Sequence, residues 1–180
     1  MRLDPLENRL NYFSLFLKIQ HLLSRYFIGL LLQLFIILIL YLTIFLIFGV
    51  ENAFIIALLC AVLNIIPYLG PLLGMIVASL LIMISGIGTD FIHTTLPNTL
   101  YVICGMLVVQ LIDNNLSQPI IFSKSTKSHP LEIFLVILIA GFLTGILGMI
   151  IAVPLYTIIK VIAKEFYPNN KFVKILTKNL

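Results

Sequence analysis

Long apolar runs, separated by short polar segments, dominate this chain. Residues 26–50 contain no Asp, Glu, Lys or Arg, and the run is long enough for a tilted helix that spans a bilayer. A second uncharged run extends from residue 52 to residue 89 and would reach about 57 Å as a single helix. The hydrocarbon core of a bilayer is only about 30 Å thick, so this second run is predicted to fold back.

Prolines and glycines in the middle of the second run predict where the chain folds back. Pro67 and Pro71 each remove a backbone donor and clash with the carbonyl four residues earlier, and Gly70 permits a close approach or a turn. We therefore expect two short helical arms, residues 53–66 and residues 72–86, joined by a break.

The break is a candidate site for a solute. Broken backbone at membrane depth is tolerated only where protein or a water-filled cavity satisfies its polar groups. Asn64, Pro67, Gly70 and Pro71 are therefore candidate binding residues. The alternative is a tight structural turn whose glycines only allow helices to pack closely.

The last apolar run, residues 133–159, is also interrupted. Gly145, Gly148 and Pro154 fall within it, and we expect a turn at residues 144–148. These residues are interpreted either as a gate or as packing positions. His129 and Pro130 precede this run. His129 is interpreted either as a loop or cap residue or as a proton carrier.

The pattern predicts an all-α polytopic membrane protein. Two spanning helices, residues 26–50 and 97–112, would each be followed by a Pro/Gly-broken helical hairpin, and the two units would have opposite orientations, as in an inverted repeat.

Composition and charge agree with a membrane protein. The chain is 61% hydrophobic and 10% charged, against about 25% charged residues in ordinary soluble domains. Lys and Arg cluster before residue 26, between residues 113 and 130, and after residue 159, which predicts that these segments and both termini are cytoplasmic. The net charge of +4 thus indicates membrane orientation and not binding to nucleic acid. The predicted domains are residues 1–25, an amphipathic cytoplasmic or interfacial helix; residues 26–165, a membrane transport domain; and residues 166–180, a basic cytoplasmic tail.

Asp113 is the candidate ion-binding residue of the chain. It follows directly on the 97–112 run and precedes Asn114, Asn115 and Gln118, so several side-chain oxygens are predicted to converge. Ionisable groups inside a membrane are costly and mark functional sites, and such a carboxylate could bind Na⁺ or carry a proton. The alternative is an interfacial carboxylate that pairs with a lysine of the following loop.

In their order and spacing, several motifs resemble the autoinducer-2 exporter (AI-2E) family. They are Asn64-Ile-Ile-Pro-Tyr-Leu-Gly-Pro71, Asp113-Asn-Asn followed by Pro119, His129-Pro-Leu131, and Gly141-Phe-Leu-Thr-Gly145-Ile-Leu-Gly148 with Ala152-Val-Pro-Leu155. The likeness covers roughly residues 25–165 and corresponds to the C-terminal half of the family's length. One departure is Ser123, near which the family often has a glycine.

The resemblance implies a multipass transporter in a bacterial inner membrane, assembled as a homo-oligomer. Family substrates include autoinducer-2, and some members exchange Na⁺ or Li⁺ for protons. We therefore expect an exporter of a small solute, with an Na⁺(Li⁺)/H⁺ antiporter as the alternative and a non-transporting scaffold as a third hypothesis. No enzyme motif is present in the sequence, and we expect no metal site and no cofactor beyond a coupling ion, H⁺ or Na⁺.

Overall fold

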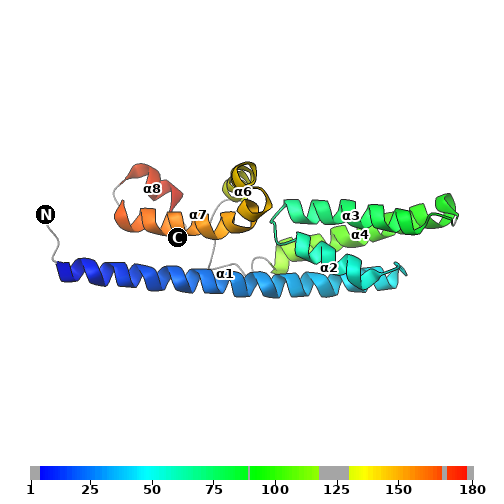
Figure 1. The fold of residues 1–180 in the computed structure, drawn as a ribbon, viewed down its shortest axis with the longest axis horizontal. Helices are drawn as coiled ribbons and strands as arrows, with labels where there is room; N and C mark the ends of the chain where they lie inside the picture. Colours follow the sequence, from blue (N-terminus) through cyan, green and yellow to red (C-terminus); the bar gives the residue numbers. More distant parts are fainter. Residues whose placement is uncertain (1–4, 89, 118–129, 168–169, 178–180) are drawn as a thin grey trace. The chain divides into compact units, whose positions relative to one another are not determined.

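The computed structural model describes residues 5–88, 90–117, 130–167 and 170–177, which form helices joined by short turns, as expected for an all-helical protein (Figure 1). No strand occurs in this part of the chain. The elements are α1 (Pro5–Ile47), α2 (Ala53–Leu63), α3 (Leu69–Ser85), η1 (Phe91–Thr95), α4 (Leu96–Ile112), η2 (Asp113–Ser117), α6 (Pro130–Thr144), α7 (Ile146–Phe166) and α8 (Lys171–Leu176), of which η1 and η2 are π-helical turns.

Among the described residues, three helical stretches are long and apolar enough to cross a membrane. They are Leu15–Ile47, Phe91–Asn115 and Ile146–Phe166. The helices α2, α3 and α6 are apolar but shorter. The chain divides into two compact units, residues 30–121 and residues 1–29 with 122–180.

The unit of residues 30–121 is built around one hydrophobic cluster to which α1, α2, α3 and α4 all contribute. On α1 the buried residues Ile37, Tyr41 and Phe45 recur every fourth position, which places them on one face of the helix. Small residues allow close packing, because a Cβ added at Gly105 of α4 would lie 2.7 Å from the Ile44 side chain of α1. Many apolar side chains outside the cluster remain exposed, as expected where lipid and not water surrounds the helices.

Helices α2 and α3 pack against each other, and their bounds correct the predicted arms. Helix α2 ends at Leu63, and α3 begins at Leu69 and not at residue 72. The prediction was wrong because it treated Pro71 as a breaker. Pro71 lies in the first turn of α3, where a backbone N–H has no partner within the helix, so a proline costs little.

Part of the segment between α3 and α4 is helical. Residues Phe91–Thr95 form a π-helical turn that leads directly into α4. The Asp90 carboxylate accepts a hydrogen bond from the backbone N–H of His93 at 3.2 Å and so caps this turn.

In the unit that contains the C-terminal part of the chain, α6 and α7 pack against each other across a one-residue turn at Gly145. Gly145 has φ 69° and ψ −150°, a conformation that is essentially restricted to glycine. Pro154 lies inside α7 and is buried, and the helix continues past it to Phe166. Pro154 therefore does not break the run in the way that the sequence predicts.

Candidate functional site

The turn between α2 and α3 places a buried amide at the end of a helix. Asn64 follows α2, and its backbone N–H donates to the carbonyls of Cys60 and Ala61, both at 3.1 Å. The Asn64 side chain is 5% exposed, and its Nδ2 has no hydrogen-bond partner among the described residues. Leaving a buried donor unsatisfied costs about 1–3 kcal/mol. The Asn64 amide is therefore a candidate donor to a bound solute.

The same turn contains a strained residue. Tyr68 has φ 66° and ψ −48°, and the Leu69 N–H donates to the Pro67 carbonyl at 2.8 Å, two residues earlier. This is a γ-turn with a positive φ, which is rare and costly for a residue with a bulky side chain. Strain of about 1–3 kcal/mol at one residue persists only where the surrounding structure enforces it, and such residues cluster at ligand sites.

Glycine is required where α3 begins. A Cβ added at Gly70 would lie 2.1 Å from the Leu63 carbonyl oxygen and 2.7 Å from the Asn64 Cα. The start of α3 therefore sits directly against the end of α2, and the Gly70 N–H donates to the Ile66 carbonyl at 2.8 Å. The predicted residues Asn64, Pro67, Gly70 and Pro71 thus form one compact break.

Asp113, in the unit of residues 30–121, is completely buried, with an exposed fraction of 0%. Helix α4 carries it at its end, and the Gln33 side chain on α1 donates a hydrogen bond to its Oδ2 at 2.8 Å. Gln33 is itself 5% exposed. A carboxylate and an amide therefore meet inside the bundle, 80 residues apart in the sequence.

A second set of polar contacts lies on the same two helices. The Tyr41 hydroxyl of α1 donates to Gln110 Oε1 at 3.5 Å, and Gln110 Nε2 donates to Asn114 Oδ1 at 3.0 Å. Asn115 instead donates to the Leu111 carbonyl of its own helix at 2.8 Å and is exposed. The structure thus brings Asp113 to Gln33, while the Asn115 amide group bonds away from it.

The position of Gln33 along α1 indicates how deep Asp113 lies in the membrane. Fourteen residues separate Gln33 from the end of α1 at Ile47, which corresponds to about 21 Å along the helix. This length is smaller than the roughly 30 Å of the hydrocarbon core. If α1 ends at one membrane surface, then Gln33 and its partner Asp113 lie within the apolar layer.

The break and the Asp113 end of α4 lie at the same end of their unit. In Figure 1 the turn that joins α2 to α3 and the end of α4 occupy the same position along the long axis. Helix α3 packs against both α2 and α4. The two predicted groups of residues therefore lie toward the same end of this unit.

The other predicted residues belong to the unit with α6 and α7 or lie outside the described part of the chain. Gly148 is closely packed, because an added Cβ would lie 2.0 Å from Thr144 Oγ1 and 2.4 Å from the Ala140 carbonyl oxygen. Pro130 is the first residue of α6. Gln118 and His129 fall outside the described residues.

Sequence reasoning missed Gln33, Tyr41 and Gln110. A usable signal was present for Gln33, which is the sole amide side chain in residues 26–50. A lone amide in an uncharged spanning run is costly unless it is hydrogen-bonded, and this cost alone makes it a candidate for contact with another polar group.

Comparison with known proteins gives one matching family. The model of the family described as "AI-2E family transporter" matches residues 2–167. Two similar proteins of Bacillus subtilis (strain 168) are each named "Putative transport protein": YueF, 38% identical over 64% of this chain and 29% of its own length, and YrrI, 34% identical over 68% and 32%. The "AI-2 transport protein TqsA" of Escherichia coli (strain K12) is 30% identical over 64% of this chain and 31% of its own length. No solved structure matches the chain, and the aligned part spans about a third of each of these relatives.

Proposed function

Because the chain belongs to the AI-2E transporter family, we propose that it acts in a membrane transporter that exports a small polar solute, an autoinducer-2-like signal. The name of TqsA supports this substrate class. The relatives are about three times as long as the aligned part, so the activity proposed is that of the whole transporter.

The observation that carries the proposal is the buried Asp113 with its Gln33 partner. A carboxylate with no exposed surface, about 21 Å from the end of a spanning helix, is costly to keep in an apolar layer. A scaffold without transport has no need of such a group or of broken backbone at that depth. A solute pathway accounts for both features.

The neighbouring break offers the donors and acceptors that an uncharged, hydroxyl-rich solute needs. The Asn64 amide supplies a buried N–H donor, and the end of α2 and the strained turn at Tyr68 supply backbone groups. Helix α2 has 11 residues and reaches only about 16 Å, so a hairpin that enters from one surface would turn inside the membrane. Such a re-entrant hairpin is the arrangement that transporters use at solute sites.

The alternative function is Na⁺(Li⁺)/H⁺ antiport, and one observation favours it. Asp113 and the side-chain oxygens of Gln33 and Asn114 are hard ligands of the kind that bind small cations. The further expectations follow from the same proposal: a homo-oligomer in the bacterial inner membrane, both termini in the cytoplasm, two oppositely oriented repeats, no cofactor and no catalysis.

Transport by the protein in liposomes tests the proposal. One arm measures export of autoinducer-2, and the other measures a dye-reported pH change when Na⁺ or Li⁺ is added. We expect Asp113→Asn to abolish whichever of these two transport signals the wild type shows, without loss of folded protein. The matched control is Asn115→Ala, since the Asn115 side chain is exposed and bonds only to its own helix in the described structure. Equal transport by Asp113→Asn and wild type would overturn the role of Asp113, and no transport by wild type in either arm would overturn the function.

A further inference from the structure

A large cavity lies within the unit of residues 1–29 and 122–180. Its volume is about 1380 Å³, and its walls are the part of α1 from residue 17 to residue 24, the end of α7, and α8 with the residue that follows it. Asp113 and the turn between α2 and α3 belong to the other unit. The described lining of the cavity therefore shares no residue with the proposed transport site.

Positive charge predominates in the described lining of this cavity. Each wall contributes one lysine: Lys18 comes from α1, Lys164 from α7 and Lys174 from α8. The carboxylate in this lining is Glu165, whose Oε2 lies 3.6 Å from Lys18 Nζ in an exposed ion pair. With His21 neutral, three lysines and one glutamate give a net charge of +2. The cavity therefore favours an anion.

The rest of the lining is partly apolar and belongs to segments that can cross a membrane. Leu17 and Leu22 lie in the stretch Leu15–Ile47, and Val161 lies in the stretch Ile146–Phe166. These side chains continue along the helices onto surfaces that are exposed and apolar. The cavity thus combines basic groups with an apolar path toward the hydrocarbon layer.

Two of the lysines lie close to the ends of these apolar stretches. Lys18 is three residues from the start of the first stretch, and Lys164 is two residues from the end of the last. A spanning helix passes from hydrocarbon to headgroups near its ends, so both lysines are expected at the level of the lipid phosphates. The clusters of Lys and Arg predict that this end faces the cytoplasm, where the leaflet carries anionic lipids.

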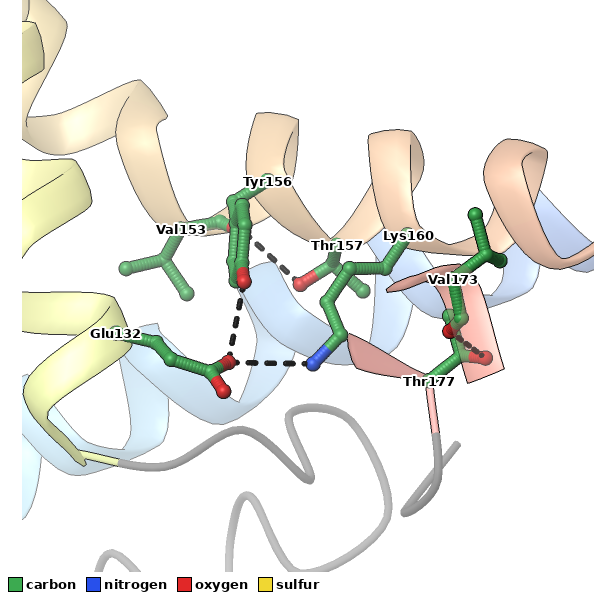
Figure 2. A network of polar contacts seen from close by, with 7 residues as sticks. All are labelled: Glu132, Val153, Tyr156, Thr157, Lys160, Val173 and Thr177. Atoms are coloured by element: carbon green, nitrogen blue, oxygen red, sulfur yellow. Dashed lines mark hydrogen bonds and ion pairs between the residues drawn. The ribbon is translucent and has the colours of Figure 1, made fainter. Parts of the chain in front are cut away.

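Helix α8 holds the third lysine on the cavity wall. It packs against α7, and the backbone N–H of Lys174 donates to the Asn170 carbonyl at 2.9 Å. The Thr177 hydroxyl donates to the Val173 carbonyl at 2.7 Å, as Figure 2 shows, and Thr177 is 5% exposed. Val173 and Thr177 both line the cavity. Hydrogen bonds and packing therefore keep this wall in place.

A lysine one turn earlier on α7 has a different arrangement. Lys160 points toward α6, where its Nζ lies 3.4 Å from Glu132 Oε2, and the Tyr156 hydroxyl donates to the same oxygen at 3.1 Å (Figure 2). The Lys160 side chain is 3% exposed and is not part of the described cavity lining. The three lysines that line the cavity are exposed, so an incoming anion can reach them.

We propose that this cavity binds an anionic phospholipid. The phosphodiester lies among Lys18, Lys164 and Lys174, and the acyl chains lie along the apolar lining. A free phosphate would account for the lysines but not for the apolar lining or for a volume above the roughly 300–1,000 Å³ of common small-molecule sites. Basic pockets beside spanning helices at the cytoplasmic surface bind lipid headgroups in other membrane proteins. The inference does not depend on which solute is transported.

Native mass spectrometry of the detergent-solubilised protein tests this inference by titration with dioctanoyl phosphatidylglycerol. Dioctanoyl phosphatidylcholine is the zwitterionic comparison, and we expect the anionic lipid to bind roughly tenfold more tightly. Lys164→Gln and Lys174→Gln should each weaken its binding about fivefold, the usual effect of one basic residue near an anionic lipid surface. Binding of phosphatidylcholine should stay unchanged in both variants, which shows that they remain folded.

Two further variants make the test specific to the cavity. Lys171→Gln is the matched control, because Lys171 is an exposed lysine of the same short helix that is not part of the described lining, and it should bind as wild type does. Equal losses in Lys171→Gln and Lys174→Gln would overturn the cavity as the site. Glu165→Gln raises the net charge of the lining to +3 and should tighten binding of phosphatidylglycerol about fivefold. A purely structural ion pair with Lys18 predicts weaker binding, and that result would overturn the inference.

Soluble competitors distinguish a lipid from a free anion. Inorganic phosphate and glycerophosphoglycerol carry the anionic group without acyl chains, so neither should displace the lipid at equal concentration. Displacement by either would overturn the lipid assignment in favour of a soluble phosphate ligand. Phosphatidylglycerol that binds no more tightly than phosphatidylcholine would also overturn it and would leave detergent or a protein segment as the occupant.

Discussion

Gly70 offers a sharp test of how α2 and α3 are held together. Alanine at this position would place its Cβ 2.1 Å from the Leu63 carbonyl oxygen, more than 1 Å inside an ordinary van der Waals contact. The opposing atoms belong to the backbone, so no side chain can rotate away. Overpacking of this kind typically costs about 1–3 kcal/mol, and here it would displace the turn that carries Asn64.

Gly74 provides the matched control one turn further along α3. An added Cβ would meet the Cys60 Cβ at 3.5 Å, which is an ordinary contact. Replacing a glycine inside a helix by alanine is otherwise favourable by roughly 0.5–1 kcal/mol. We therefore expect Gly74→Ala to be neutral or stabilising, and the two variants to differ by roughly 2–4 kcal/mol.

Thermal unfolding of both variants in the same detergent measures this difference. At about 2–4 °C per kcal/mol for a chain of this size, the Tm of Gly70→Ala should lie roughly 4–16 °C below that of Gly74→Ala. Equal Tm values would refute the close contact between the start of α3 and the end of α2. A lower Tm for Gly74→Ala would refute the packing of the two helices as described.

Four other substitutions test the remaining features. Gln33→Leu removes the donor to Asp113 and should lower the free energy of unfolding by about 1–3 kcal/mol. The loss should be clearly smaller in an Asp113→Asn background. Equal losses in the two backgrounds of this double-mutant cycle would contradict the contact. Asn64→Leu should abolish transport without lowering Tm, because it removes a buried donor that lacks a partner among the described residues; retained transport would remove Asn64 from the site. Tyr68→Gly should be more stable than Tyr68→Ala, by about 1 kcal/mol in denaturant unfolding, since glycine tolerates the positive φ. Gly145→Ala should cost about 1–3 kcal/mol in the same assay, and an unchanged midpoint would contradict the turn conformation between α6 and α7.

The sequence predicted the helical class for identifiable reasons. A run without charges that is too long for one crossing has to bend, and Pro67 marks where α2 cannot continue. The bounds were less accurate, because a proline ends a helix or starts one according to its place. Pro71 and Pro154 were both interpreted as breakers, yet one lies in the first turn of α3 and the other inside α7.

The polar contacts between distant residues could not be predicted from the sequence. Asp113 was identified as a candidate by its cost in an apolar setting, but nothing in the sequence pairs it with Gln33, 80 residues away. Lys160 was assigned with the basic residues near the C-terminus, because a lysine at the end of an apolar run usually extends to the membrane surface. Its burial depends on the turn at Gly145, which returns α7 alongside α6 and so brings Lys160 to Glu132.

The two cysteines offer a way to measure how often the hairpin of α2 and α3 opens. Cys60 has no exposed surface, and its thiol donates to the Gly74 carbonyl of α3 at 3.4 Å, whereas Cys104 on α4 is exposed. A membrane-permeant maleimide should therefore reach Cys60 only while α2 and α3 are apart. In a Cys104→Ser background, the rate of Cys60 alkylation reports how often the hairpin of α2 and α3 opens. A solute that changes this rate is thereby identified as a ligand that acts on the opening.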